Sequence, residues 1–307
     1  MLNVVRRGKQ LRAKALIAFG DFVGLNLVRV KDYYSPLPVN SQIRRTMPRW
    51  FRASGLSGIS YDIDAMKRTF TDLHRSFSED FRMNAGGYER NTAAGFGPGF
   101  PALDAQTLYY MLRRLKPKRY LEIGSGLSSY YASLAAARNK EEGQPLAITC
   151  IEPFPHRALM SIDGITVIEK MAQDVPVSEF EKLEAGDVLF IDSSHALKID
   201  SDVAYLMLEV LPRVARGVVV HIHDVPFPYN VPFPPERWIF GEDWPVYWNE
   251  AMVVQAFLAF NTAFEVMLST PMIRYADKSF LPSLMGADLP PTPDSNPYSS
   301  LWLKRVN

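Results

Sequence analysis

The sequence predicts an α/β protein with a doubly wound, mostly parallel sheet of seven strands, preceded by a mainly helical or irregular N-terminal cap. Three observations favour this class. Short apolar segments alternate with helical segments from residue 119 onward, as in strands joined by crossover helices. Turns containing glycine or acidic residues follow several of these segments. The 307 residues are 47% apolar and 22% charged, which is typical of a globular protein.

The N-terminal segment is basic and then apolar. Residues 1–14 include five Arg and Lys residues and no acid, and an apolar run follows over 15–30. Asp21 interrupts this run, which falls short of the ~20 clean apolar residues of a spanning helix. Apolar residues such as Leu16 and Phe19 recur at helical spacing. We expect an amphipathic helix that packs on its own protein or on a second copy rather than on a membrane, in a cytoplasmic protein.

We place a domain boundary at residue 95. Residues 1–95 show no regular alternation of strands and helices, and residues 31–61 are rich in aromatic residues, Pro and Arg. We expect this part to be a cap or an oligomerisation segment. Residues 96–307 are expected to form the main domain.

The strands and helices of the main domain follow in order. Asp104 is expected to cap a helix whose buried stripe includes Leu108 and Met111 and which ends at Pro117. Strands are expected at 120–123, 147–151, 164–168, 188–191, 217–222, 264–268 and 300–306, and further helices at 128–137, 201–211 and 248–260. Ligands of such sheets bind beyond the carboxyl ends of the strands, so the residues at those ends are the candidates for function.

A long loop over 225–247 is expected to be a lid. Residues 225–246 contain six prolines and six aromatic residues. Loops of this length in compact domains usually serve a function, and the aromatic side chains are suited to form an apolar wall over a pocket. This loop is the second place where we expect contact between copies of the chain.

Two glycines mark the first strand end, in the run Glu122-Ile123-Gly124-Ser125-Gly126. Without a Cβ, they allow a tight turn and a close approach of the backbone to a ligand. Ser129 stands where the dinucleotide pattern has its third glycine, which counts against a nicotinamide cofactor.

The pattern E-x-G-x-G resembles the first motif of the class I S-adenosylmethionine-dependent methyltransferases, and residues 95–307 are most similar to the Rossmann-like branch called methyltransferase family 24. The resemblance makes residues 96–307 the catalytic domain and implies S-adenosylmethionine as cofactor. It places an acid, Glu152, on the ribose hydroxyls, for which one carboxylate can accept both hydrogen bonds. The cofactor-binding residues that it implies are Glu122, Gly124, Ser125, Gly126, Glu152, Gln173, Asp174 and Asp192.

Histidines and acids gather at the fourth and fifth strand ends. With a period of two, His221 and His223 share one face of a strand, and Asp192, His223 and Asp224 are expected to converge at one sheet edge. Some O-methyltransferases and a related hydroxylase branch hold a divalent ion in this way, so the resemblance implies Asp192, His223 and Asp224 as metal ligands. A histidine in place of the commoner acid or amide leaves Mg²⁺, Mn²⁺, Fe²⁺ and Zn²⁺ open.

The resemblance implies methyl transfer to a hydroxyl oxygen of a small molecule, a sugar or a secondary metabolite. Either a metal lowers the pKa of that hydroxyl, or His195 or His221 removes its proton as a general base. Asp192 is the third catalytic candidate. Three alternatives stay open: a metal-dependent hydroxylase or oxygenase on the same fold, a non-catalytic binding or assembly protein, and a nicotinamide enzyme.

The near-balanced charge argues against one class of partner. Lys and Arg number 34 against 33 Asp and Glu, which gives a net charge of +1, and no nucleic acid partner is expected. The single cysteine excludes an internal disulfide framework and a Cys-rich zinc module.

Overall fold

The computed structural model describes residues 2–29, 33–96, 99–241, 244–290 and 299–307. Two compact units are distinguished, Met1–Trp50 and Phe51–Asn307, so the division lies far from the boundary expected at residue 95. The reason is α4 (Ile63–Asn84), whose side chains Met66, Phe70 and Leu73 are at most 2% exposed. These side chains belong to the main hydrophobic core, which therefore extends well upstream of residue 95.

The first unit is helical in its described part. It contains α1 (Leu2–Phe22), α2 (Asn40–Arg45) and α3 (Met47–Trp50). The apolar run predicted a helix over residues 15–30, but helix α1 begins and ends earlier than this run. It ends where Gly24 adopts φ +72° and the Leu25 N–H donates to the Gly20 carbonyl at 2.7 Å, a left-handed C-terminal turn that suits glycine. No helix in the described part of the chain is long and apolar enough to cross a membrane.

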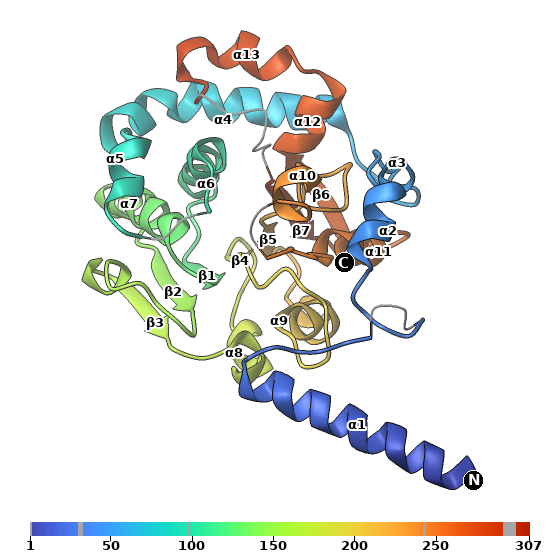
Figure 1. The fold of residues 1–307 in the computed structure, drawn as a ribbon. Coiled ribbons are helices and arrows are strands. Elements are labelled where there is room, and N and C mark those ends of the chain that lie inside the picture. Colours follow the sequence, from blue (N-terminus) through green and yellow to red (C-terminus); the bar gives the residue numbers. More distant parts are fainter. Residues whose placement is uncertain (1, 30–32, 97–98, 242–243, 291–298) are drawn as a thin grey trace. The chain divides into compact units, whose positions relative to one another are not determined.

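The second unit contains a seven-stranded sheet in the order β3-β2-β1-β4-β5-β7-β6, visible edge to edge in Figure 1. The strands are β1 (Arg119–Ile123), β2 (Ala147–Ile151), β3 (Ile165–Ile168), β4 (Val188–Ile191), β5 (Val219–Ile222), β6 (Phe264–Ser269) and β7 (Leu301–Arg305). All pairs are parallel except those of β7 with β5 and with β6. The predicted fold class and all seven predicted strands are confirmed.

Helices cover both faces of the sheet. Figure 1 shows α4, α6 and α7 gathered on one side, and α8 and α9 on the other. The elements of this unit besides α4 and the strands are α5 (Tyr88–Ala93), α6 (Ala102–Leu115), α7 (Leu127–Glu141), η1 (Leu159–Ser161), η2 (Ala172–Asp174), α8 (Val177–Phe180), α9 (Asp202–Tyr205), η3 (Leu206–Val210), η4 (Leu211–Arg213), α10 (Pro235–Trp238), α11 (Glu250–Leu258), α12 (Thr270–Ala276), α13 (Phe280–Met285) and η5 (Gly286–Asp288).

Two features of the sheet position the site. Central strands β1, β4 and β5 are buried over nearly their whole length, so they lie within the core. The chain order reverses between β1 and β4, since β2 and β3 lie on one side of β1 and the later strands on the other. Such a reversal leaves a crevice at the carboxyl ends of the two strands.

The role expected for Asp104 is wrong. Helix α6 begins at Ala102 behind Pro101, and Asp104 lies inside its first turn rather than at its cap. Its side chain is fully buried and accepts hydrogen bonds from the backbone N–H and the hydroxyl of Ser299. This acid therefore belongs to the interior beside β5 and β7, not to the end of its helix.

Candidate active site

The glycine turn after β1 is shaped by close contacts. Gly124 has φ +91°, and a Cβ there would lie 2.4 Å from the carbonyl oxygen of Asp192. Gly126 has φ +150°, and a Cβ there would lie 2.8 Å from the carbonyl oxygen of Phe96. Only glycine fits both positions without moving backbone. The turn after β1 is thus packed directly against the chain that leaves β4.

Glu122 lies beneath this turn rather than on its open side. Its carboxylate is fully buried and accepts hydrogen bonds from the hydroxyls of Ser128 and Ser129. The Ser129 hydroxyl oxygen in turn accepts from the Gly126 N–H at 3.1 Å. Burial raises the pKa of Glu122 to about 8, against the smaller lowering effect of the two serines. Glu122 therefore supports the glycine turn and the start of α7 through these hydrogen bonds.

Glu152 follows β2 and faces the glycine turn. Its Oε2 accepts from the Ser125 hydroxyl at 3.2 Å, and its Oε1 accepts from the backbone N–H of Phe154 at 2.7 Å. The side chain is half-buried, so the carboxylate is oriented while still open to a ligand. Gln173 and Asp174 lie in η2 after β3, but the Gln173 amide donates to the carbonyl of Asp200 at 3.0 Å and Asp174 is exposed.

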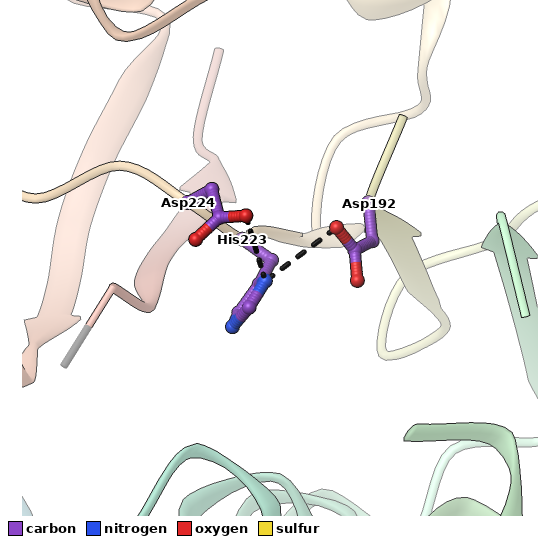
Figure 2. A group of neighbouring side chains, drawn as sticks. All are labelled: Asp192, His223 and Asp224. Carbon is purple, nitrogen blue, oxygen red and sulfur yellow. Dashed lines mark ion pairs between the residues drawn. The ribbon is translucent and has the colours of Figure 1, made fainter. Parts of the chain in front are cut away.

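Asp192, His195, His223 and Asp224 form one group, here named the acid–histidine cluster. One ligand atom each from Asp192, His223 and Asp224 lies within 4.8 Å of the others, and Figure 2 shows the two carboxylates flanking the imidazole. His223 Nδ1 is 3.5 Å from Asp192 Oδ1 and 3.8 Å from Asp224 Oδ2. The predicted convergence of these three side chains is therefore found in the structure.

The two nitrogens of His223 have different surroundings. Nε2 is 3.3 Å from Asp104 Oδ2 and 3.2 Å from Ser299 Oγ. Nδ1 is buried and has no hydrogen-bond partner among the described residues, although it faces the two carboxylates. A buried ring nitrogen without a hydrogen bond is costly unless something binds it. A histidine whose other nitrogen donates to a carboxylate is the usual arrangement of a metal ligand, so these residues fit a divalent cation.

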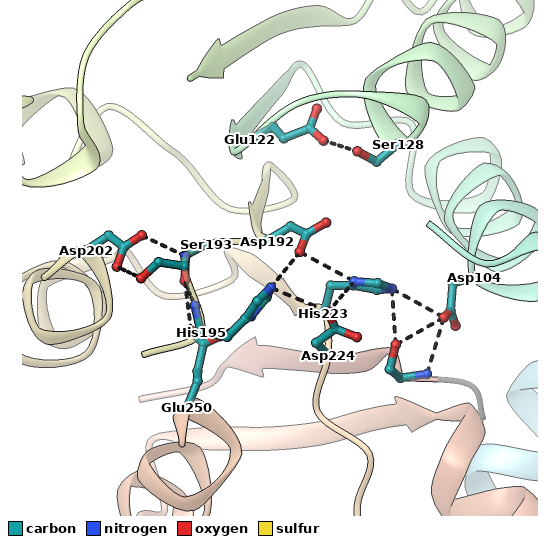
Figure 3. A network of polar contacts seen from close by, with 12 residues as sticks. Asp104, Glu122, Ser128, Asp192, Ser193, His195, Asp202, His223, Asp224 and Glu250 are labelled. Atoms are coloured by element: carbon teal, nitrogen blue, oxygen red, sulfur yellow. Dashed lines mark hydrogen bonds and ion pairs between the residues drawn. The ribbon is translucent and has the colours of Figure 1, made fainter. Parts of the chain in front are cut away.

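His195 approaches the same carboxylates from another side. Its Nε2 is 3.2 Å from Asp192 Oδ1 and 3.4 Å from Asp224 Oδ2, and its Nδ1 is 2.7 Å from Glu250 Oε2. Figure 3 shows this network running from Asp202 through the cluster to Asp104. His195 and Asp224 both adopt positive φ, +56° and +55°. Backbone strain of this kind persists where the surroundings enforce it, and it gathers at functional sites.

The acids and histidines of the cluster shift one another's pKa. Burial alone lowers the pKa of His195, but Asp192, Glu250 and Asp224 raise it well above the ordinary value. Burial also lowers the pKa of His223, and Asp224, Asp192 and Asp104 more than reverse this effect. Conversely, burial would raise the pKa of Asp192, yet the two histidines bring it far below the usual range. The carboxylates thus stabilise the positive charge of both histidines, and the two histidines stabilise the negative charge of Asp192.

His221 is not brought to this cluster. It is fully buried in β5, stacks on Trp302 at 3.9 Å between ring centroids, and contacts Phe190 at 4.4 Å. Its Nε2 lies 3.0 Å from the Ser300 hydroxyl. Burial lowers its pKa well below the ordinary value. This histidine is a neutral member of the aromatic core, so a role as a general base has no geometric support.

The reasoning from sequence missed Asp104 as a site residue and did not assign a partner to Glu250. Asp104 looked like a helix cap because it precedes an apolar helical stripe. Glu250 is 1% exposed in the first turn of α11, and its buried partner His195 lies 55 positions away. The only local signal for either residue is an acid within an apolar segment.

Aromatic side chains of the long loop stand beside the cluster. A small pocket of about 30 Å³ is lined by Asp224, Phe233, Trp238 and Trp248 among others. Trp238 stacks on Trp248 with 5.5 Å between ring centroids, and Trp248 contacts the ring of His195 at 4.5 Å. The expected apolar wall is therefore present beside Asp224.

Comparisons with known proteins agree with this geometry. A family model described as a methyltransferase domain, of the family 24 type, matches residues 121–225. Residues 121–225 are a methyltransferase domain. This domain begins within β1 and ends directly after the cluster, so it contains the glycine turn, Glu152 and all four cluster residues. Asp104 and Glu250, which contact the two histidines, lie outside the matched range.

Other proteins are similar to the chain that carries this methyltransferase domain. An uncharacterized protein of Archaeoglobus fulgidus is 27% identical over an alignment of 202 positions, which covers 60% of this chain and 88% of the relative. A methyltransferase of Podospora anserina with bound S-adenosylhomocysteine is 14% identical, covers 89% of this chain and 99% of its own, and has a TM-score of 0.40. An O-methyltransferase of Bacillus cereus in complex with S-adenosylhomocysteine is 15% identical, with 79% and 100% coverage and a TM-score of 0.42.

Proposed function

We propose that this enzyme is an S-adenosylmethionine-dependent O-methyltransferase that methylates a hydroxyl of a small molecule, a sugar or a secondary metabolite, with a divalent metal at the acid–histidine cluster. The observation that carries the proposal is the contact of Gly124 with Asp192. A Cβ at Gly124 would meet the Asp192 carbonyl at 2.4 Å, while the Asp192 carboxylate belongs to the cluster. One residue therefore links the cofactor turn to the cation site.

The glycine turn and Glu152 are suited to bind the cofactor. The Glu152 carboxylate is oriented by Ser125 and is only half-buried. A carboxylate in this position can accept hydrogen bonds from both ribose hydroxyls. The tight turn lets backbone approach a ligand at the start of α7, as in related nucleotide sites. These residues would hold the donor, and the adjacent cluster would hold the acceptor.

The chemistry requires an acceptor oxygen that has lost its proton and lies in line with the donor methyl group. When bound, S-adenosylmethionine supplies a methyl group on a positive sulfur, and a divalent cation lowers the pKa of a hydroxyl that it binds. Asp192, His223 and Asp224 would hold that cation. Trp238 and Trp248 line the pocket beside Asp224; they would limit the access of water to this carboxylate, which would strengthen its electrostatic interactions.

His195 is the residue that we propose to take the acceptor's proton. Glu250 fixes its Nδ1, and its Nε2 faces the carboxylates of Asp192 and Asp224. If a bound cation neutralised the charge of these carboxylates, the pKa of the His195 imidazole would fall. The neutral imidazole could then act as a base. The products are then the methyl ether and S-adenosylhomocysteine, with the proton on Nε2.

Calorimetric titration with S-adenosylhomocysteine and with NAD, each with and without Mn²⁺, tests the proposal. We expect S-adenosylhomocysteine to bind and NAD not to bind, and Mn²⁺ to bind the wild type but not Asp224→Asn. Absence of S-adenosylhomocysteine binding would refute the proposed reaction. The hydroxylase alternative gains no support from the comparisons, and it requires O₂ consumption that an oxygen electrode would detect.

The proposal extends to the organisation of the protein. The catalytic region would lie within residues 96–307, with the loop over 225–247 as its lid. A homo-oligomer would form through the N-terminal segment or this loop, in the cytoplasm. Sedimentation of the full chain and of a chain without residues 1–50 would test whether the N-terminal segment forms the contact between copies.

A further inference from the structure

A second cavity lies next to the cluster. It has a volume of about 400 Å³, which is in the range of sites for small molecules. Its walls come from the loop that follows β5 and from α12 with the residues after it. The side chains used in the argument are Pro226, Tyr229, Phe233, Arg274, Tyr275 and Lys278, and they define what is here named the aromatic–basic cavity.

The aromatic–basic cavity shares wall residues with the small pocket that Asp224 lines. Pro226 and Phe233 line both, and Asp224 lines the small pocket. Pro226 also follows Asp224 by only two positions. A molecule that presents one group to Asp224 therefore has a neighbouring space for the rest of its body.

The cavity walls combine flat rings with positive charge. Tyr229 lies 5.7 Å from Phe233 and 6.1 Å from Tyr275 between ring centroids, which offers faces and edges to a ring of the ligand. Arg274 and Lys278 are its charged lining residues, and none of the nine lining residues is acidic. The nearest acid in sequence, Asp277, is engaged by Lys67 at 2.8 Å and by the Ser279 hydroxyl at 2.7 Å.

We propose that the aromatic–basic cavity binds the body of the acceptor, and that the acceptor is a cyclic molecule carrying an anionic substituent, a carboxylate or a phosphate. The ring would lie among Tyr229, Phe233 and Tyr275. Arg274 and Lys278 would pair with the anion, since guanidinium and ammonium groups are strong donors to both kinds of anion. The inference rests on the proposed function, because it treats the cluster as the place where the acceptor hydroxyl reacts.

Two matched pairs of probes test the charge preference on the full chain saturated with S-adenosylhomocysteine and Mn²⁺. The carboxylate arm compares 3,4-dihydroxybenzoate with 3,4-dihydroxybenzyl alcohol, and the phosphate arm compares glucose 6-phosphate with glucose. Binding is followed by saturation-transfer NMR and calorimetry. We expect the charged member of at least one pair to bind about tenfold or more tightly than its neutral partner, and the arm that shows this identifies the anion.

The double variant Arg274→Gln/Lys278→Gln should abolish this preference and leave the affinity for S-adenosylhomocysteine unchanged. Lys170→Gln, an exposed cation that does not line the cavity, is the control and should behave as wild type. Equal binding of charged and neutral probes, a preference that survives in the double variant, or no binding of either charged probe at about 10 mM would each overturn the inference. Loss of S-adenosylhomocysteine binding by the wild type would instead overturn the proposed function.

Discussion

Nε2 of His223 lies 3.3 Å from Oδ2 of Asp104, although 119 positions separate the two residues in the chain. Both side chains are fully buried. Because Asp104 contacts Nε2, Nδ1 is left to face Asp192 and Asp224, to which it makes ion-pair contacts of 3.5 and 3.8 Å but no hydrogen bond among the described residues. Asp104 is therefore a positioning residue for the proposed cation site, contributed from a helix outside the matched methyltransferase domain.

Asp104→Asn should weaken Mn²⁺ binding by about 10–100-fold, as loss of such outer partners usually does. The amide keeps the volume of the side chain but removes the charge that orients the imidazole. Titration of Mn²⁺ by electron paramagnetic resonance would measure the affinity, with S-adenosylhomocysteine binding as a check that the fold is intact. Asp163→Asn, at an exposed position, is the matched control. Unchanged Mn²⁺ affinity in Asp104→Asn would contradict the positioning role.

Glu152→Gln should lower the affinity for S-adenosylhomocysteine by about 10–100-fold, because hydrogen bonds to a charged group are worth about 1.5–3 kcal/mol. The amide retains the size of the side chain and loses acceptor strength toward ribose hydroxyls. Calorimetry would measure the change. Glu169→Gln removes an exposed acid near the end of β3 and should have no effect. Equal losses in both variants would mean that the general charge, not the ribose contact, is responsible.

Gly124→Ala and Gly164→Ala form a pair that separates steric contact from backbone strain. Both glycines have positive φ, +91° and +84°, but the space beside Gly164 is open, whereas a Cβ at Gly124 would lie 2.4 Å from the Asp192 carbonyl. Gly164→Ala should cost only the strain of about 1–2 kcal/mol. Gly124→Ala should cost more and also abolish S-adenosylhomocysteine binding. Urea unfolding and calorimetry would measure both effects; equal destabilisation of the two variants would argue against the tight contact.

Glu122→Gln should change how stability depends on pH. The pKa of Glu122 is raised from 4.5 to about 8 by burial, so the folded state binds this proton more tightly than the unfolded state. The contribution to stability is complete below the unfolded pKa and is lost as pH rises through the folded value. Wild type should therefore lose stability between about pH 4.5 and 8 relative to Glu122→Gln. Urea unfolding at several pH values in this window would show it, and parallel curves for the two proteins would contradict the buried protonated acid.

The fold was accessible from sequence because its signals are local. Apolar runs such as 188–191 and 219–222 form fully buried strands, and a central parallel strand needs only such a run between turns. The convergence of Asp192, His223 and Asp224 followed from the same rule, since carboxyl ends of parallel strands meet at one edge. The observed N-terminal helix differs in position from the predicted one. Hydrophobic periodicity does not indicate that the helix ends at a left-handed turn at Gly24.

By itself, the sequence determined the order of strands and helices, the glycine turn and the acids that follow the strands, since each depends on residues within a few positions of one another. Only the tertiary structure decided that Asp104 and Glu250 orient His223 and His195, that His221 belongs to an aromatic core, and that residues 51–95 join the main unit. These features are contacts between segments tens of positions apart. They arise when helices pack on the sheet and bury side chains together, which no local pattern specifies.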